Sequence, residues 1–300
     1  MNNLIPFTKK YESSENLVGL LVSRGLWVDD KNKAARYLDN IGYYRLSAYM
    51  YPFLRMPKSA HRYKDNATFG KVMMLYRFDK KLRMLMFNEI EKVEIAIRRS
   101  VMQIPAEMIG NPFWLTAPSN FLDGSKFNDT MRAISNEYNK SKEEYIIHFK
   151  RTYSNPYPPS WILGELLTIG NVNAIYRNIK YNRVRKRIAK HFGLPINVFE
   201  SWLTVLAVMR NACGHHTRVW NKQNAICPAI PRNPGGRWIS LPTDPLRAYF
   251  DLCIIKYFLN FVSPDNDMQL KLTWLFIRFP EIDITALGFP YGWEMESLWR

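Results

Sequence analysis

Hydrophobic residues recur three and four positions apart through most of the chain, which is the spacing of helices with one buried face. The clearest run extends from about Phe69 to Met108, with apolar residues at Val72, Leu75, Phe78, Leu82, Leu85, Ile90, Val93, Ile97, Val101 and Ile104. It predicts one long amphipathic helix. Pro105 lacks a backbone N–H, so we expect it to kink or end this helix.

Shorter runs of the same kind predict further helices at about 17–25, 34–41, 43–49, 126–151, 161–167, 182–192, 195–214, 246–262 and 267–277. The tyrosine-rich helix at 43–49 is expected to be buried against its neighbours. Ser160 is expected to cap the helix that follows it. Gly214 is expected to end the helix that begins near Pro195.

The segment from Lys222 to Pro245 has no helical period and contains five prolines and two adjacent glycines. It predicts an ordered loop with a small hairpin around residues 238–241. No linker separates two hydrophobic cores, so we expect one all-α domain over residues 1–300. Within it we expect an N-terminal helical decoration (1–65), a helical core (66–222), and a loop with C-terminal helices (223–300).

The charge of the chain is strongly positive, with a formal net charge of +16 and a sequence pI near 9.7. Between Glu165 and Asp244 the only acidic residue is Glu200, against twelve Lys or Arg residues. This balance favours a polyanionic partner, either nucleic acid or an anionic membrane surface. The basic run at 183–190 is short for a membrane anchor, so we expect RNA to bind at Arg177, Lys180, Arg183, Arg185, Lys186, Arg187 and Lys190.

The cysteines and the N-terminus indicate the compartment. Cys213, Cys227 and Cys253 form no Cys-x-x-Cys pair, which argues for a reducing environment. Residues 1–4 lack the basic and apolar regions of a signal peptide, and no stretch reaches roughly 18 apolar residues. We therefore expect a soluble cytoplasmic protein with no membrane partner.

Candidate chemistry is concentrated at residues 210–221, where Arg210 and His215 lie five residues apart in a basic region. On a continuous helix they would point about 140° apart, but a helix that ends at Gly214 places His215 in the exit turn. A His with an ordinary pKa can move a proton at neutral pH, and a guanidinium can stabilise negative charge at phosphorus. Asn211 could hold a phosphate oxygen or orient Arg210. This set predicts RNA cleavage that uses no metal or cofactor.

Other interpretations of these residues remain open. Arg210 and the two histidines would also complement the negative end of a helix dipole. Cys213, His215 and His216 suggest a metal site, although their spacing matches no zinc pattern. One Arg and one His make a sparse site, so an enzyme of this kind is expected to be a homodimer with its cleft at the two-fold axis.

Glu94 and Arg98 lie four residues apart on the long predicted helix, so their side chains can pair. They form either an ordinary surface ion pair or a support that orients Arg210.

The fuller pattern resembles the Abi-like family of bacterial abortive-infection proteins, which is grouped with the HEPN superfamily of helical ribonucleases. The resemblance lies in residues 210–221, 42–47, 90–98, 158–161 with Gly170, and 287–290. It implies a HEPN-type helical bundle, dimerisation and RNA cleavage through Arg210 and His215, with His216 and Arg218 in supporting positions. Some relatives also pair with a small non-coding RNA that restrains them.

The leading hypothesis is therefore a toxin-like endoribonuclease of phage defence. It would leave a 2′,3′-cyclic phosphate and a 5′-hydroxyl. The alternative is a non-catalytic protein that uses the same basic surface to hold a structured non-coding RNA.

Overall fold

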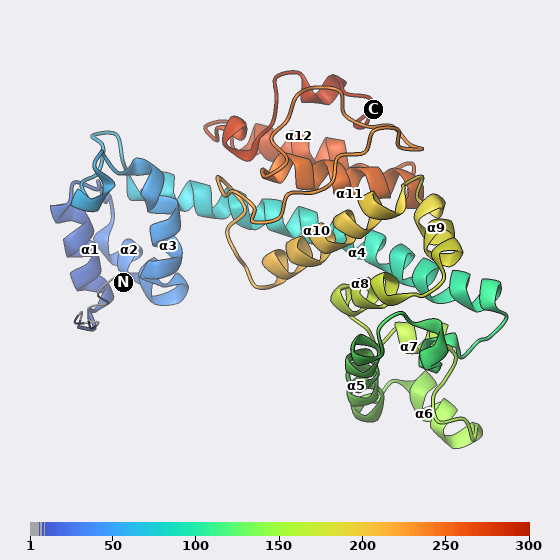
Figure 1. Cartoon of the computed structure of the whole chain (residues 1–300). Coiled ribbons are helices and arrows are strands. Elements are labelled where there is room, and N and C mark those ends of the chain that lie inside the picture. The colour runs from blue at the N-terminus through green and yellow to red at the C-terminus, as the bar shows by residue number, and fades with distance from the viewer. Residues whose placement is uncertain (1–5, 7, 9) are drawn as a thin grey trace. The chain divides into compact units, whose positions relative to one another are not determined.

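The computed structural model describes Pro6, Thr8 and residues 10–300 (Figure 1). The prediction about a signal peptide rests on residues 1–4 and lies outside this part of the chain. The described residues form twelve α-helices and short 3-10 turns, with isolated bridges but no β-strand. This confirms the all-α class. By its internal contacts the chain divides into two compact units.

The first unit comprises residues up to Lys81 together with Phe279–Ile282. It contains α1 (Ser14–Ser23), α2 (Lys31–Ile41), α3 (Tyr43–Met50) and the start of α4 (Phe69–Ile109). The side chain of Ser13 caps α1, and that of Asp30 caps α2. Gly42, at φ 89°, ends α2 and begins α3. A side chain would be strained in that conformation, which is why glycine suits this corner.

The predicted burial of the tyrosines in α3 is only partly correct. Tyr49 is 2% exposed, and its hydroxyl donates to Asp79 Oδ2 at 2.6 Å. Tyr44, by contrast, is 76% exposed. Residues five apart on a helix point in different directions, so only one face of this short helix meets the core.

The second unit comprises Leu82–Arg278 and Asp283–Arg300. Its helices after α4 are α5 (Gly124–Lys140), α6 (Glu144–Thr152), α7 (Ser160–Gly164), α8 (Ile169–Asn178), α9 (Asn182–His191), α10 (Ile196–Gly214), α11 (Ala248–Val262) and α12 (Met268–Arg278). Helix α11 is buried at every residue from Ala248 to Leu259, as expected of a helix that is apolar on all sides. Helices α10 and α11 pack together in this unit (Figure 1).

The long helix predicted from the hydrophobic period is confirmed as α4, which runs for 41 residues. Of the two outcomes expected at Pro105, an end of the helix is wrong, because the helix continues to Ile109. Proline removes one backbone hydrogen bond. The segment around the missing backbone hydrogen bond is packed into the core, since it contains the buried residues Val101, Met102 and Pro105. This packing keeps the segment helical.

Two predicted helices are interrupted. The helix expected at 126–151 is two helices, because Ser141 and Glu143 adopt extended backbone at ψ 130° and 135°. The helix expected at 161–167 stops at Gly164, and a new one begins after Thr168, which forms a capping box with Asn171. Polar side chains near a backbone N–H compete with helix continuation in this way.

Two local details differ as well. Ser160 is not a cap, because its hydroxyl donates to the carbonyl of Pro112 at 2.8 Å. No hairpin forms at 238–241, where the backbone N–H groups of Ser240 and Leu241 instead donate to the buried carboxylate of Glu296. In both places a long-range partner replaces the expected local one.

Helices α9 and α10 meet at a bend of 66°. No single helix among the described residues has the length and hydropathy of a membrane span, and only this bent pair meets both criteria together. Helix α10 is largely a core element, since nine of its residues are buried.

A buried carboxylate fastens the loop that follows α10 to the central helix α11. Asp251 is 2% exposed and accepts a hydrogen bond from Asn224 Nδ2 at 2.6 Å. Burial raises the pKa of Asp251 to about 7, although the bond from Asn224 and the charge of Lys222 act in the opposite direction. The protonated form is therefore the one that the fold favours.

We expect Asp251→Asn to stabilise the protein above neutral pH. The pKa of Asp251 is higher in the folded state than in the unfolded state, so its stabilising contribution is complete below about pH 4. That contribution is lost as the pH rises to about 7. The variant should match the wild type at pH 4 and exceed its free energy of unfolding by about 2–4 kcal/mol at pH 8. Urea denaturation at several pH values measures this difference. Asp265→Asn, at an exposed aspartate, is the control, and parallel curves for all three proteins would contradict the prediction.

Candidate active site

The candidate site lies at the C-terminal end of α10, whose buried face anchors it in the second unit. The helix ends at Gly214 as predicted, and His215 is its C-cap. The N–H of His216 donates to the carbonyl of Cys213 at 3.2 Å, and that of Thr217 to Ala212 at 2.8 Å. These two bonds form a Schellman motif, which satisfies carbonyls at the helix end.

The residue that turns the chain at this point is His216, not Gly214. His216 has a φ of 58°, in the left-handed region that glycine usually occupies in this motif. Gly214 is the last helical residue, and a Cβ there would meet Phe87 at an ordinary contact distance of 3.8 Å. The turn leaves His215 exposed just beyond the last helical turn.

Arg210 is held on the other side of the same helix end. Its Nε lies 3.7 Å from Glu94 Oε2, and its guanidinium lies over the ring of Phe87 at 5.7 Å from the ring centroid. Nε is buried and makes no hydrogen bond, so its contact with Glu94 is that of two opposite charges, and the side chain as a whole is 36% exposed. The guanidinium therefore lies between a buried carboxylate, an aromatic ring and solvent.

Glu94 belongs to α4 and lies between two arginines. It is 8% exposed and accepts a hydrogen bond from Arg98 Nη2 at 2.8 Å. Arg98 also donates to the carbonyl of Leu167 at 3.2 Å and lies 3.6 Å from Glu165. Glu94 and Arg98 therefore lie beside Arg210, and the chain of charges links α4, α10 and the segment before α8. A carboxylate with this little exposure needs such cations to offset its lost hydration.

The three residues proposed for catalysis are close in sequence, but no contact joins their side chains. Asn211 and His215 lie four residues apart, and the N–H of His215 donates to the carbonyl of Asn211 at 2.8 Å. Their side chains therefore share a helix face, from which Arg210 is turned by about 100°. No hydrogen bond, ion pair or ring contact joins the side chains of the three residues anywhere in the described structure. His216 is exposed and Arg218 half-buried in the turn that follows.

The basic residues predicted to bind RNA lie at the opposite end of α10. Arg185 pairs with the carboxylate of Glu200, and Arg177 donates to the carbonyl of Glu200 at 3.2 Å. Arg210 lies ten positions after Glu200 on this helix, a rise of about 15 Å along the helix axis. The remaining cations of this group are exposed, namely Lys180, Arg183, Lys186, Arg187 and Lys190.

Exposed apolar side chains lie on the same two helices as Glu94 and Arg210. Met84, Phe87 and Ile95 of α4 are 61%, 40% and 53% exposed, and Val208 of α10 is 45% exposed. Positions 84, 87 and 95 fall on one side of α4 by helical spacing. A group of large exposed apolar residues beside a charged site is typical of an interaction surface.

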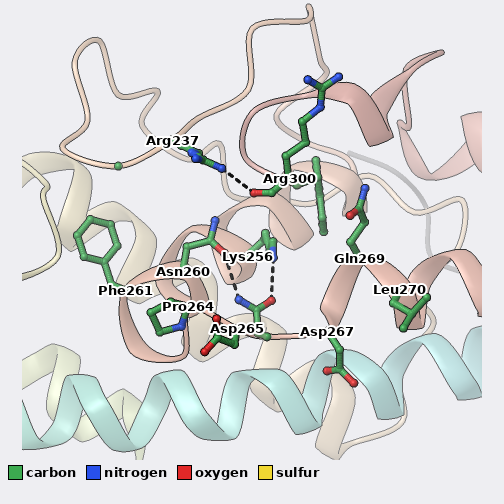
Figure 2. Close-up of a pocket in the computed structure, with 13 residues that line it drawn as sticks. Arg237, Lys256, Asn260, Phe261, Pro264, Asp265, Asp267, Gln269, Leu270 and Arg300 are labelled. Carbon is green, nitrogen blue, oxygen red and sulfur yellow. Dashed lines mark hydrogen bonds between the residues drawn. The ribbon is translucent and has the colours of Figure 1, made fainter.

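A separate cavity of about 620 Å³ lies between α11, α12 and the C-terminal segment (Figure 2). Its polar groups bond to one another. Lys256 donates to Asn266 at 2.8 Å, Asn266 donates to Asn260 at 3.1 Å, and Arg237 donates to the carbonyl of Arg300 at 2.9 Å. Burial lowers the pKa of Lys256. These hydrogen bonds connect polar residues of the second unit to one another, far in sequence from residues 210–221.

Among the described residues, no three His, Cys, Asp or Glu side chains gather closely enough to hold a metal ion. None of the three cysteines forms a disulfide, and Cys213 and Cys253 are buried.

Sequence reasoning missed two members of the site. Phe87 contacts Arg210 and lies opposite Gly214, and it was not among the positions that define the predicted buried face of α4. Glu165 completes the chain of charges beyond Arg98. A signal for Phe87 was available. It is a large apolar residue that does not fall on the period of the buried positions Leu82, Met86 and Ile90, so it is left exposed on α4.

Compared with known protein families, residues 36–221 match the family described as Abi-like protein. The matched segment contains Glu94, Arg98 and the whole of α10 with its exit turn. No curated protein and no solved structure shows significant similarity to the chain. Because the match covers well over half of the sequence, the chain belongs to the Abi-like protein family.

Proposed function

We propose that this protein is a metal-independent endoribonuclease of the HEPN type that acts in bacterial abortive infection. Its family suggests the role in resistance to phage. The observation that carries the chemistry is the state of Arg210. Its guanidinium lies beside the carboxylate of Glu94, its side chain is 36% exposed, and an exposed histidine follows at the helix end.

RNA supplies its own nucleophile in the 2′-hydroxyl group. His215 would take the proton from this hydroxyl or give one to the leaving 5′-oxygen. The two terminal nitrogens of Arg210 would bind the phosphate oxygens as negative charge gathers on them, with Asn211 as a further donor. The products are a 2′,3′-cyclic phosphate and a 5′-hydroxyl, and DNA is not a substrate because it lacks the 2′-hydroxyl.

A homodimer would complete the site. In one chain no hydrogen bond, ion pair or ring contact of the described residues joins Arg210 to His215, and one Arg with one His makes a sparse site. A two-fold interface over the exposed apolar residues Met84, Phe87, Ile95 and Val208 would bring Arg210 of one copy toward His215 of the second. The exposed cations of α9 would hold the RNA strand. The same surface suits a structured small RNA that restrains the enzyme.

The first test is cleavage of labelled total RNA by the purified protein in excess EDTA. We expect fragments with cyclic phosphate ends from the wild type. Removal of Arg210 or His215 should lower the rate by about 100-fold or more, since each acts on the transition state. His148→Ala, at an exposed histidine outside the site, is the control and should cleave like the wild type.

The alternative function is a non-catalytic protein that holds a structured RNA. The exposed basic face of α9 favours it as much as it favours an enzyme. Tight, salt-sensitive RNA binding with intact RNA in every variant would establish this alternative and refute the nuclease.

The role of Glu94 is testable without removing either proposed catalytic group. Glu94→Gln should lower kcat about 10- to 100-fold, because a misplaced guanidinium loses transition-state contacts. The affinity for an uncleavable 2′-deoxy substrate should change little. Glu165→Gln, at the far end of the charge chain, serves as the comparison and should have a much smaller effect. An equal loss in both variants would mean that Glu94 is not specific in positioning Arg210.

Mixing two inactive variants tests the shared site. A dimer of one Arg210→Ala copy and one His215→Ala copy would contain one complete site and one empty site. Co-refolding equal amounts should therefore restore about a quarter of the wild-type activity, because half of the dimers are mixed. Sedimentation analysis verifies the dimers. No recovery in verified mixed dimers would show that Arg210 and His215 act within one copy.

A further inference from the structure

A tyrosine-lined cavity lies in the first unit, away from the motif in sequence. We propose that this cavity binds an unpaired nucleotide of RNA. The proposal rests on the proposed function only in taking RNA as the partner. It assigns a second contact, which reads the single-stranded state of the RNA and takes no part in cleavage.

The cavity has a volume of about 820 Å³, which is within the usual range for small-ligand pockets. Its lining residues come from α1, α3 and the segments before α1 and after α3, all of which belong to the first unit. Figure 1 shows these helices. Its walls include Tyr11, Tyr43, Tyr44, Tyr51 and Tyr63. Five tyrosines around one cavity give an unusually aromatic lining for so small a unit.

Three of these rings are open to solvent. Tyr11, Tyr44 and Tyr51 are 91%, 76% and 53% exposed. The rings of Tyr43 and Tyr44 meet edge to face, with centroids 5.9 Å apart, so their contact does not stack the two rings. Exposed aromatic faces of this kind are the surfaces on which proteins stack unpaired bases.

The cavity wall also offers a buried hydroxyl with spare hydrogen-bonding capacity. Tyr63 is 6% exposed, and its hydroxyl donates to the sulfur of Met50 at 3.5 Å, a weak acceptor. Burial raises the pKa of Tyr63 to about 12, so the group stays neutral. A better acceptor on a bound base would replace the sulfur, and the hydroxyl oxygen could accept a bond from an amino group.

Positive charge surrounds the cavity. Arg24 lies in its wall, and Lys58 Nζ sits 3.8 Å from the ring centroid of Tyr51. Residues 10–81 contain fourteen Lys or Arg and seven Asp or Glu, a net charge of +7. The acidic residue of the lining, Glu12, accepts a hydrogen bond from Asn16 at 3.1 Å. This field attracts a phosphate and opposes a basic proline-rich peptide, the other common ligand of aromatic grooves.

The experiment uses the full chain with His215→Ala, so that RNA stays intact. A single-stranded oligonucleotide of mixed sequence containing 4-thiouridine is cross-linked by light, and the linked peptides are identified by mass spectrometry. We expect links at Tyr44 or Tyr51. In anisotropy titrations, Tyr44→Ala should weaken binding of the single strand roughly 5- to 150-fold, the range for loss of one stacked base.

Matched variants separate a pocket effect from a general one. Tyr44→Phe keeps the ring and should retain affinity, and Tyr291→Ala, at a fully exposed tyrosine of the second unit, should behave like the parent. A duplex of the same sequence should bind equally to the parent and to Tyr44→Ala. Links confined to α9, with unchanged affinity in Tyr44→Ala, would overturn the pocket but leave the nuclease intact. Saturable binding of a proline-rich peptide that RNA does not displace would overturn it too. If no RNA binds at all, the proposed function itself falls.

Discussion

A carboxylate enclosed by two guanidinium groups holds the candidate site together. Glu94 contacts Arg98 on its own helix and Arg210 on α10, and it has almost no access to water. Such a group is stable only while both cations remain, because its hydration has been lost. The contact therefore joins α4 to α10 and sets the direction of Arg210 at once. The arrangement of Phe87, Glu165 and the helix end is built around this one ion pair.

The same helix contains a second acidic anchor, and together they explain how a very basic chain forms a core. Glu89 is fully buried and accepts hydrogen bonds from Lys92 and from Lys271 of α12. Burial alone would raise the pKa of Glu89, but the two lysines outweigh it and lower the pKa below its usual value. Buried carboxylates thus neutralise the cations that lie between helices. The remaining positive charge stays on the surface, where a polyanion can meet it.

The glycine at position 214 was enough to predict the end of α10. Periodicity alone was enough to predict α4, α9 and α10, because their buried faces follow the helical period. It failed where the outcome depends on distant partners. Ser160 bonds Pro112, and the segment at 238–241 is held by Glu296, contacts that no local pattern contains. The site divides in the same way. Glu94 could be suspected from its spacing to Arg98, but its contact with Arg210 joins two helices more than a hundred residues apart.

The left-handed turn at His216 gives the two halves of the motif different tolerances to changes in chain length. Adding or deleting one residue before Arg210 within α10 would rotate it by about 100° and separate it from Glu94. A residue added after Gly214 would lengthen only the exit turn and leave that ion pair in place. The number of residues between the arginine and the histidine is therefore adjustable at one point. A pattern search that fixes this spacing at four would overlook chains with the same architecture and a longer turn.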